Sequence, residues 1–335
     1  MSRSRILPVL VSVALLGYLA STIDLRAAAR SLTLEIGLRF ALPLLAWNFA
    51  TLLIEAHSLH RVTAAVGHAV SRTSAARIKS ASYLLSLVHY AAGATALAFL
   101  LRRRIGGDLA FAASTVFVIA LLDIGSVAGL AALSAALLPT VGAGLRTGLL
   151  LGMLAALAAG LFVLRSPWPF GAAAESTGGS LGGLASRTLE RLRELPILHG
   201  ARTLPIARIA ELLALRLVFV CCYVALMAGL FRAFEVEVPL ASLPFKVAIL
   251  LAVSALPIAA AGLGTAQLAF VKLFSGAAPD PVLLSMSIAL SIGVVLARSS
   301  LGLVFSRELV REGIAAQSSM RDASTRSSRD ASRRR

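Results

Sequence analysis

Long apolar segments dominate this chain, and two of them are interrupted by residues that weaken helices. Hydrophobic residues make up 58% of the 335 residues and charged residues only 14%, whereas a soluble domain carries about 25% charged residues. The interrupted segments, residues 82–101 and 244–271, mix Gly, Pro or small polar residues into apolar sequence. A broken helix is tolerated in a bilayer only where protein or a water-filled cavity satisfies its backbone. The sequence therefore predicts an all-α membrane protein with a polar interior.

Six uninterrupted apolar runs are long enough to cross a bilayer as helices. They are residues 6–23, 36–56, 109–137, 145–164, 209–234 and 282–305. The first run, preceded by Arg3 and Arg5, also resembles a signal peptide, but a retained helix gives the other segments a consistent topology. We therefore expect a polytopic transmembrane helix bundle of about six spans plus the two broken segments.

Basic residues in the loops predict the orientation, because Arg and Lys are enriched on the cytoplasmic side. Basic residues between 61 and 79, and the cluster at 102–104, flank segment 82–101, so both of its ends are expected inside. That segment is then re-entrant from the cytoplasm. Segment 244–271 follows the acidic Glu235 and Glu237 and is expected to be re-entrant from outside. The alternative of eight spans would place residues 102–104 outside.

Two re-entrant segments of opposite orientation are typical of secondary transporters with inverted-repeat halves. We predict an integral membrane domain at 1–306, with a Gly- and Ser-rich cytoplasmic linker and a short amphipathic helix at 165–208. That helix could lie on the inner leaflet or be a plain solvated helix. Residues 307–335 are predicted to be a disordered basic tail. Both termini are expected in the cytoplasm, and the chain in the plasma (inner) membrane.

The net charge of +16 does not indicate nucleic-acid binding, because the basic residues lie in loops and tails where they contact anionic lipid head groups. No nucleotide fingerprint or nucleophile elbow is present, so no cofactor and no catalytic residue is predicted. His57 and His60, with Glu55 and His68 nearby, form an incomplete metal-ligand set, and no metal site is predicted.

Ionisable residues within spans are the main functional candidates, because each is costly at the centre of a bilayer. Asp123 lies in the middle of its span, and Arg216 and Arg298 lie within theirs. Ser291 shares a helical face with Arg298. These residues could line a polar path through the bundle, or they could pair internally and fix helix packing.

Asn48 and Glu55 also share a helical face, since they are seven residues apart. Glu55 lies near the end of the predicted span 36–56. We interpret it as a side chain that reaches the membrane surface, which is a sufficient explanation for charges near span ends.

The second broken segment offers a different kind of site. Pro257, Gly262, Gly264 and Gln267 lie within eleven residues, and a helix restarting near Gly264 would present free backbone N–H groups to an anion. The alternative is a kinked helix packed tightly against its neighbours.

These features resemble the flippase-like integral membrane domain of lysylphosphatidylglycerol synthases. Residues 257–267 are similar to the family motif Pro-x-x-x-Gly-Gly-x-Gly-x-x-Glu, with Gln267 in place of Glu. Asp123 resembles the aspartate of a Glu-Arg-x-x-Asp motif, and Arg298 an arginine common in the last spans. In the first half, residues 87–93 retain little of the family pattern beyond Gly93. The resemblance implies that aminoacyl transfer belongs to a separate soluble domain, for which this chain has no room.

The combined expectation is a transporter-like protein that binds or translocates an anionic lipid or lipid-linked molecule between leaflets. The substrate-binding residues would be Asp123, Arg216, Pro257, Gly262, Gly264, Gln267, Ser291 and Arg298. The alternative is a non-catalytic scaffold or accessory subunit for a lipid- or glycan-modifying enzyme, with a membrane-embedded transferase as a minor third candidate. A homo-oligomer or an accessory enzyme is a possible partner.

Overall fold

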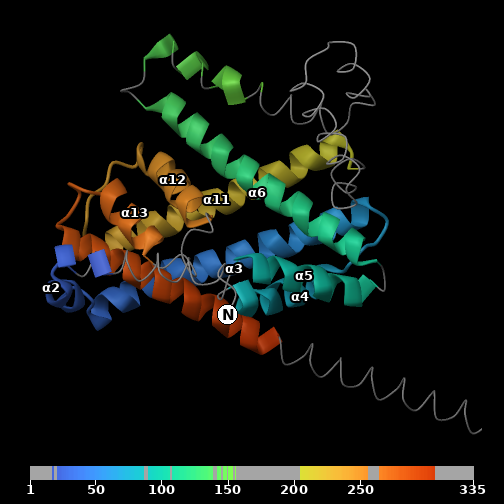
Figure 1. The fold of residues 1–335 in the computed structure, drawn as a ribbon, viewed down its shortest axis with the longest axis horizontal. Coiled ribbons are helices and arrows are strands. Elements are labelled where there is room, and N and C mark those ends of the chain that lie inside the picture. The colour runs from blue at the N-terminus through green and yellow to red at the C-terminus, as the bar shows by residue number, and fades with distance from the viewer. Residues whose placement is uncertain are drawn as a thin grey trace, which may run out of the picture.

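The computed structural model describes residues 17–18, 21–86, 90–105, 108–138, 142–155 (except 145, 149 and 154), 204–255 and 264–305. Over these residues the chain is helical, and its only β-type pairing is an isolated bridge between Ser275 and Ala278. Figure 1 shows the helices packed against one another at varied inclinations. The predicted all-α fold is confirmed.

Four helices are long and apolar enough to cross a membrane. They are α3 (Leu34–Ala65), α6 (Leu109–Leu137), α11 (Ile206–Ala233) and the helix Asp280–Phe305. They correspond to four of the six predicted spans. The predicted spans 6–23 and 145–164 lie largely outside the described residues. The remaining helices are shorter: α2 (Leu25–Arg30), α4 (Arg72–Ser86), α5 (Tyr90–Ile105), α12 (Leu243–Ala255) and α13 (Thr265–Leu273).

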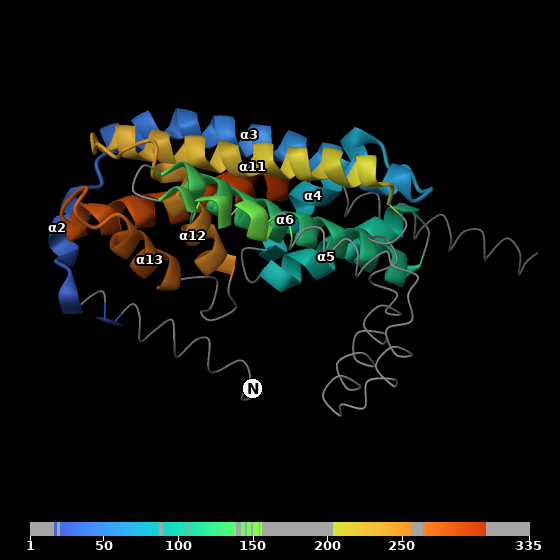
Figure 2. The same cartoon turned by 90° about the horizontal axis from the view of Figure 1, so that it is seen from above.

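Helices α3 and α11 run antiparallel, side by side along the molecule (Figure 2). An ion pair joins them at each end. Arg61 donates to both carboxylate oxygens of Glu211, at 2.5 and 2.8 Å, near the C-terminal end of α3. Arg39, near the opposite end of α3, pairs with Glu235 just after α11. The two ends of α3 therefore define the two ends of the bundle.

The first broken segment forms a helical hairpin from α4 and α5, which pack against each other. The guanidinium of Arg104, at the end of α5, donates to the hydroxyl of Ser74, near the start of α4, over 3.2 Å. The helices approach closely where they turn, because a Cβ on Gly93 would lie 2.4 Å from the Cβ of Ser86. The start and the end of this segment therefore lie at the same end of the helix bundle.

The second broken segment forms another hairpin from α12 and α13. The ammonium of Lys246, near the start of α12, lies 5.2 Å from the ring centroid of Phe274, just after α13. Helix α13 begins directly after Gly264, which has a φ of 91°. That conformation favours glycine because it has no Cβ. The sequence prediction of a helix restarting near Gly264 is therefore confirmed.

The two hairpins open at opposite ends of the bundle. Hairpin α4–α5 follows the C-terminal end of α3, where the carbonyl of Val70 lies 2.6 Å from His60 Nδ1. Hairpin α12–α13 follows the C-terminal end of α11, beside Arg39 and Glu235. Figure 1 shows the two pairs of helices in different halves of the molecule. The structure has the predicted inverted arrangement, while the compartment that each end faces stays a prediction.

The buried apolar residues form two large clusters, and each cluster contains one of the hairpins. One core cluster contains Phe40 and Trp47 of α3, the C-terminal half of α11 and hairpin α12–α13. A second contains Ala56 and Leu59 of α3, the N-terminal part of α11 and hairpin α4–α5. Each hairpin thus has its own large apolar cluster, while Ala248 of α12 also packs with Leu130 and Val220 in a small third one. The stretch of α3 between Trp47 and Ala56 lies at the boundary of the two large clusters.

Candidate functional site

The carboxylate of Glu55 occupies this boundary and binds three side chains. Lys79 Nζ lies 2.8 Å from one oxygen, and Arg298 Nη1 lies 3.0 Å from the other. The hydroxyl of Tyr83 also donates to Glu55. Lys79 and Tyr83 come from hairpin α4–α5, and Arg298 from the helix Asp280–Phe305. Glu55 is only 6% exposed, so one buried carboxylate joins three helices.

Arg298 also contacts other residues of α3 and α4. Its Nη2 donates to the Thr51 hydroxyl over 3.2 Å. Its guanidinium carbon lies 4.0 Å from the ring centroid of Tyr83 and 4.7 Å from that of Trp47. Cation–π contacts and charge-assisted hydrogen bonds of this kind stabilise a buried arginine. Three of these contacts come from one face of α3, because Trp47, Thr51 and Glu55 are spaced four residues apart along the helix.

A third ion pair joins two neighbouring helices, α11 and α6. Arg216 Nη1 in α11 is 3.1 Å from Asp123 Oδ1 in α6. Arg216 is 1% exposed, whereas about a third of the Asp123 side chain is exposed. The pair satisfies Arg216 only in part, because its buried Nε has no hydrogen-bond partner among the described residues. The alternative of internal pairing, which the sequence left open for Asp123, is therefore present, and its partner is Arg216.

These three ion pairs form one charged cluster, which we define as Glu55, Lys79, Asp123, Arg216 and Arg298. Arg216, Lys79 and Arg298 all interact electrostatically with Glu55, and Asp123 interacts with Lys79. Three cations face two carboxylates, so the charged cluster carries one excess positive charge. Groups of this type are costly in a membrane interior and usually mark functional sites.

A separate polar connection holds the second hairpin. The backbone N–H of Gly264 donates to Gln267 Oε1 over 2.7 Å, and Gln267 Nε2 donates to the Ser291 hydroxyl over 3.1 Å. Gln267 is 4% exposed, and Ser291 itself donates to the carbonyl of Ser287. Gln267 therefore links the first turn of α13 to the helix Asp280–Phe305.

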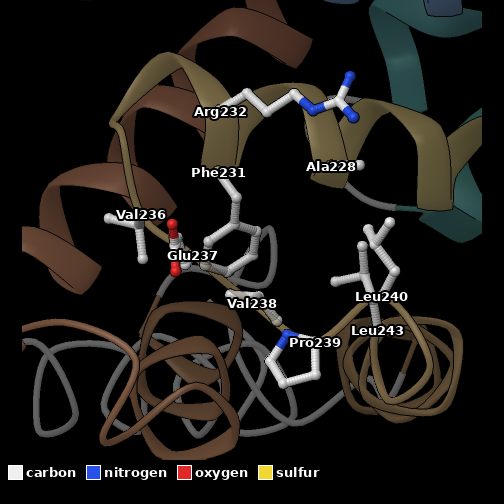
Figure 3. Close-up of a pocket in the computed structure, with 9 residues that line it drawn as sticks. All are labelled: Ala228, Phe231, Arg232, Val236, Glu237, Val238, Pro239, Leu240 and Leu243. Atoms are coloured by element: carbon white, nitrogen blue, oxygen red, sulfur yellow. The ribbon is translucent and has the colours of Figure 1, made fainter.

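A surface pocket of about 580 Å³ lies at the end where hairpin α12–α13 opens (Figure 3). Its lining is mostly apolar, including Phe231 at the end of α11 and Leu243 at the start of α12, with Arg232 and Glu237 among the polar groups. Its described lining includes no residue of the charged cluster and none of the predicted site residues that the structure describes. The pocket is thus separate from the candidate site.

The family described as the lysylphosphatidylglycerol synthase TM region matches residues 5–302. The chain belongs to this family. The match covers nearly the whole range over which the motifs of residues 257–267, Asp123 and Arg298 indicated a resemblance. The comparison with curated proteins gave no match.

For this member of the lysylphosphatidylglycerol synthase TM-region family, the structure brings the predicted site residues together in two groups. Asp123 and Arg216 pair with each other, and Gln267 contacts Ser291 and Gly264. Arg298 joins Glu55 instead of Asp123. Pro257 and Gly262 lie outside the described residues.

The prediction for Glu55 was wrong. Its side chain does not reach the membrane surface, because it is buried against α4 and the helix Asp280–Phe305. It also does not lie at a helix end, since α3 continues to Ala65. Lys79 and Tyr83 were missed altogether. The available signal was their spacing of four residues in α4, which places a cation and a hydroxyl on one helical face.

Proposed function

We propose that this integral membrane protein binds an anionic lipid or lipid-linked molecule in its interior and moves it between leaflets. The supporting observation is the position of the charged cluster. It lies between two apolar halves, each with a hairpin that opens at the opposite end of the bundle.

The excess positive charge of this cluster favours an anionic ligand. Arg and Lys side chains hold phosphate and carboxylate groups through charge-assisted hydrogen bonds, which are stronger where water is excluded. The negative charge of a head group bound in the cluster would balance its one excess positive charge. The hairpins would give access to it from one end and then the other, as in carriers with inverted repeats.

The same observation argues for binding and translocation without chemistry. Among the described residues, each carboxylate of the cluster is engaged by a cation, and Tyr83, whose hydroxyl donates to Glu55, packs against the guanidinium of Arg298. The cluster resembles a binding site more than a pair of acid and base groups. We therefore propose no catalytic role for it.

The test is lipid movement in proteoliposomes that contain the purified full chain. A fluorescent phosphatidylglycerol placed in both leaflets is quenched from outside, and the rate of loss of the protected half reports translocation. We expect faster movement than in protein-free vesicles, and a smaller effect on fluorescent phosphatidylcholine, which has no net charge.

A matched pair of double variants locates the effect. Glu55→Gln with Arg298→Gln removes an interior ion pair. Glu35→Gln with Arg39→Gln removes an exposed pair, together with the exposed contact of Arg39 with Glu235. Neither changes the net charge. We expect the first to slow translocation at least tenfold and the second to leave it unchanged. Equal rates for both variants would remove the charged cluster from the transport path, and binding without any movement would favour the scaffold alternative.

A further inference from the structure

Of the two carboxylates in the charged cluster, Asp123 is the less firmly held. Glu55 is 6% exposed and contacts two cations and one hydroxyl. Asp123 has a single ion-pair partner among the described residues, Arg216, and about a third of its side chain is exposed. A charged side chain within a membrane is costly unless partners compensate it. Asp123 is therefore the carboxylate of the cluster at which a proton can bind and leave.

Asp123 lies at the point where α6 passes from one hairpin to the other. Helix α6 packs against both α5 and α12. On the N-terminal side of Asp123, Val118 and Ile119 belong to the apolar cluster of hairpin α4–α5. On its C-terminal side, Leu130 packs with Ala248 of α12. Because the two hairpins open at opposite ends of the bundle, movement of either one would bring water to Asp123 from a different side.

Arg216 connects the two carboxylates. It is 1% exposed, and it interacts electrostatically with both Asp123 and Glu55. Its Nε has no hydrogen-bond partner among the described residues, which is costly for a buried donor. If Asp123 were neutral, the charge of Arg216 would be opposed by Glu55 alone, which already faces Lys79 and Arg298. The charge state of Asp123 therefore controls how strongly the cluster attracts an anion.

Among the described residues, the charged groups that face Asp123 belong to the charged cluster. Besides its ion-pair partner they are Lys79 of α4 and Glu55 of α3. Helices α5 and α12 also pack against α6, but their charged residues, 102–104 and Lys246, lie at the outer ends of these helices. A proton on Asp123 would thus act mainly on the cluster itself.

We propose that Asp123 binds and releases a proton in each transport cycle, so that the anion and a proton move together. The inference rests on the proposed function and adds its driving force. With both carboxylates ionised, the cluster has one excess positive charge, and a proton from water on an Asp123 carboxylate oxygen raises the excess by one. A bound monoanion then restores the original charge. Loss of the proton on the other side re-forms the Asp123–Arg216 pair and weakens the hold on the anion. A monoanion and a proton would cross without net movement of charge.

The test imposes a pH gradient on proteoliposomes that contain the purified full chain. Fluorescent phosphatidylglycerol is added to the outer leaflet, and its final distribution is measured with an external quencher. At equal pH we expect equal amounts in the two leaflets. With the interior one pH unit more alkaline, coupling to one proton should shift the ratio of inner to outer lipid by up to about tenfold, and the reverse gradient should invert the shift. Protein-free vesicles are measured alongside, because a gradient alone can redistribute a weakly acidic lipid.

Variants assign the proton site. Asp123→Asn cannot take up a proton at this position, so its final ratio should not respond to the gradient, whereas Asp123→Glu keeps a carboxyl group and should retain the response. Glu35→Gln removes an exposed carboxylate that pairs with Arg39. It is the matched control and should respond like the wild type. A wild-type response in Asp123→Asn would overturn the assignment.

Infrared difference spectra of the purified full chain measure proton binding without transport. Between mildly alkaline and mildly acidic pH, exposed carboxyl groups stay ionised, because their ordinary pKa values are about 4. We expect the wild type to gain the C=O band of a protonated carboxylic acid. Asp123→Asn should lack this band, and Asp123→Glu should show it at a shifted frequency. An unchanged band in Asp123→Asn would place the proton on another residue.

The outcomes separate this inference from the proposed function. If the wild type moves no lipid at any pH, the proposed function fails. If it moves lipid but the final ratio is the same under both gradients, only the coupling to a proton fails.

Discussion

Replacing Glu55 by Gln should destabilise the protein more than the loss of any single exposed charge. The carboxylate lies 2.8 Å from Lys79 Nζ and 3.0 Å from Arg298 Nη1. With an effective dielectric constant of about 20, each contact corresponds to an attraction of about 6 kcal/mol. The cost of removing these ions from water offsets much of this attraction. Loss of one partner nevertheless leaves buried cations without compensation, which typically costs about 3–5 kcal/mol.

Unfolding of the purified protein in detergent, followed by helical circular dichroism against denaturant, measures this change. We expect Glu55→Gln to lower the free energy of unfolding by about 3–5 kcal/mol. Glu35→Gln, which breaks an exposed pair with Arg39, is the control and should have no measurable effect. Combining Glu55→Gln with Lys79→Met should recover part of the loss, because one uncompensated cation is removed. A Glu55→Gln variant as stable as the control would refute the idea that this carboxylate holds the buried cations.

Three further predictions address the hairpins. Gly93→Ala should destabilise the protein by about 1–3 kcal/mol in the same unfolding assay, because the new Cβ would lie 2.4 Å from that of Ser86. Gly264→Ala should cost about 1–2 kcal/mol, since a side chain at a φ of 91° is strained, and wild-type stability would contradict the observed start of α13. Single cysteines at Arg103 and Glu237, in a chain without its native cysteines, should react with impermeant maleimide from opposite sides of the membrane. Labelling of both from one side would contradict the inverted arrangement.

The sequence was sufficient for four of the six predicted spans and for the presence of the two broken segments. Long apolar runs predicted four spans that the structure describes, because burial in lipid requires about twenty apolar residues in a helix. The inverted order of the hairpins could also be predicted. It follows from the basic residues at 102–104 and the acidic Glu235 and Glu237, which lie at opposite ends of the bundle.

The partners within the site could not be predicted in the same way. The contact between Glu55 and Arg298 joins residues that are 243 positions apart in the sequence. Helical periodicity predicts which residues share a face of one helix, but it does not predict which faces of two helices contact each other. The prediction placed Glu55 at a span end because apolar sequence stops there. The helix continues because the following polar residues gain partners in the fold, such as the Arg61–Glu211 pair. Tertiary contacts thus extended α3 beyond its apolar part.

The helix Asp280–Phe305 contacts both hairpins through polar groups, which gives the inverted arrangement a physical connection. Ser291 accepts from Gln267 of hairpin α12–α13, and Arg298 shares Glu55 with Lys79 of hairpin α4–α5. Buried ion pairs contribute little net stability compared with apolar packing, because the cost of dehydration offsets their attraction. Their partners can therefore be exchanged for those of a bound anion at a smaller cost than an apolar contact can be broken. A ligand that draws a cation away from Glu55 would loosen hairpin α4–α5 while the Ser291 contact still holds hairpin α12–α13. Under the proposed function, this asymmetry would allow the two ends to open one at a time.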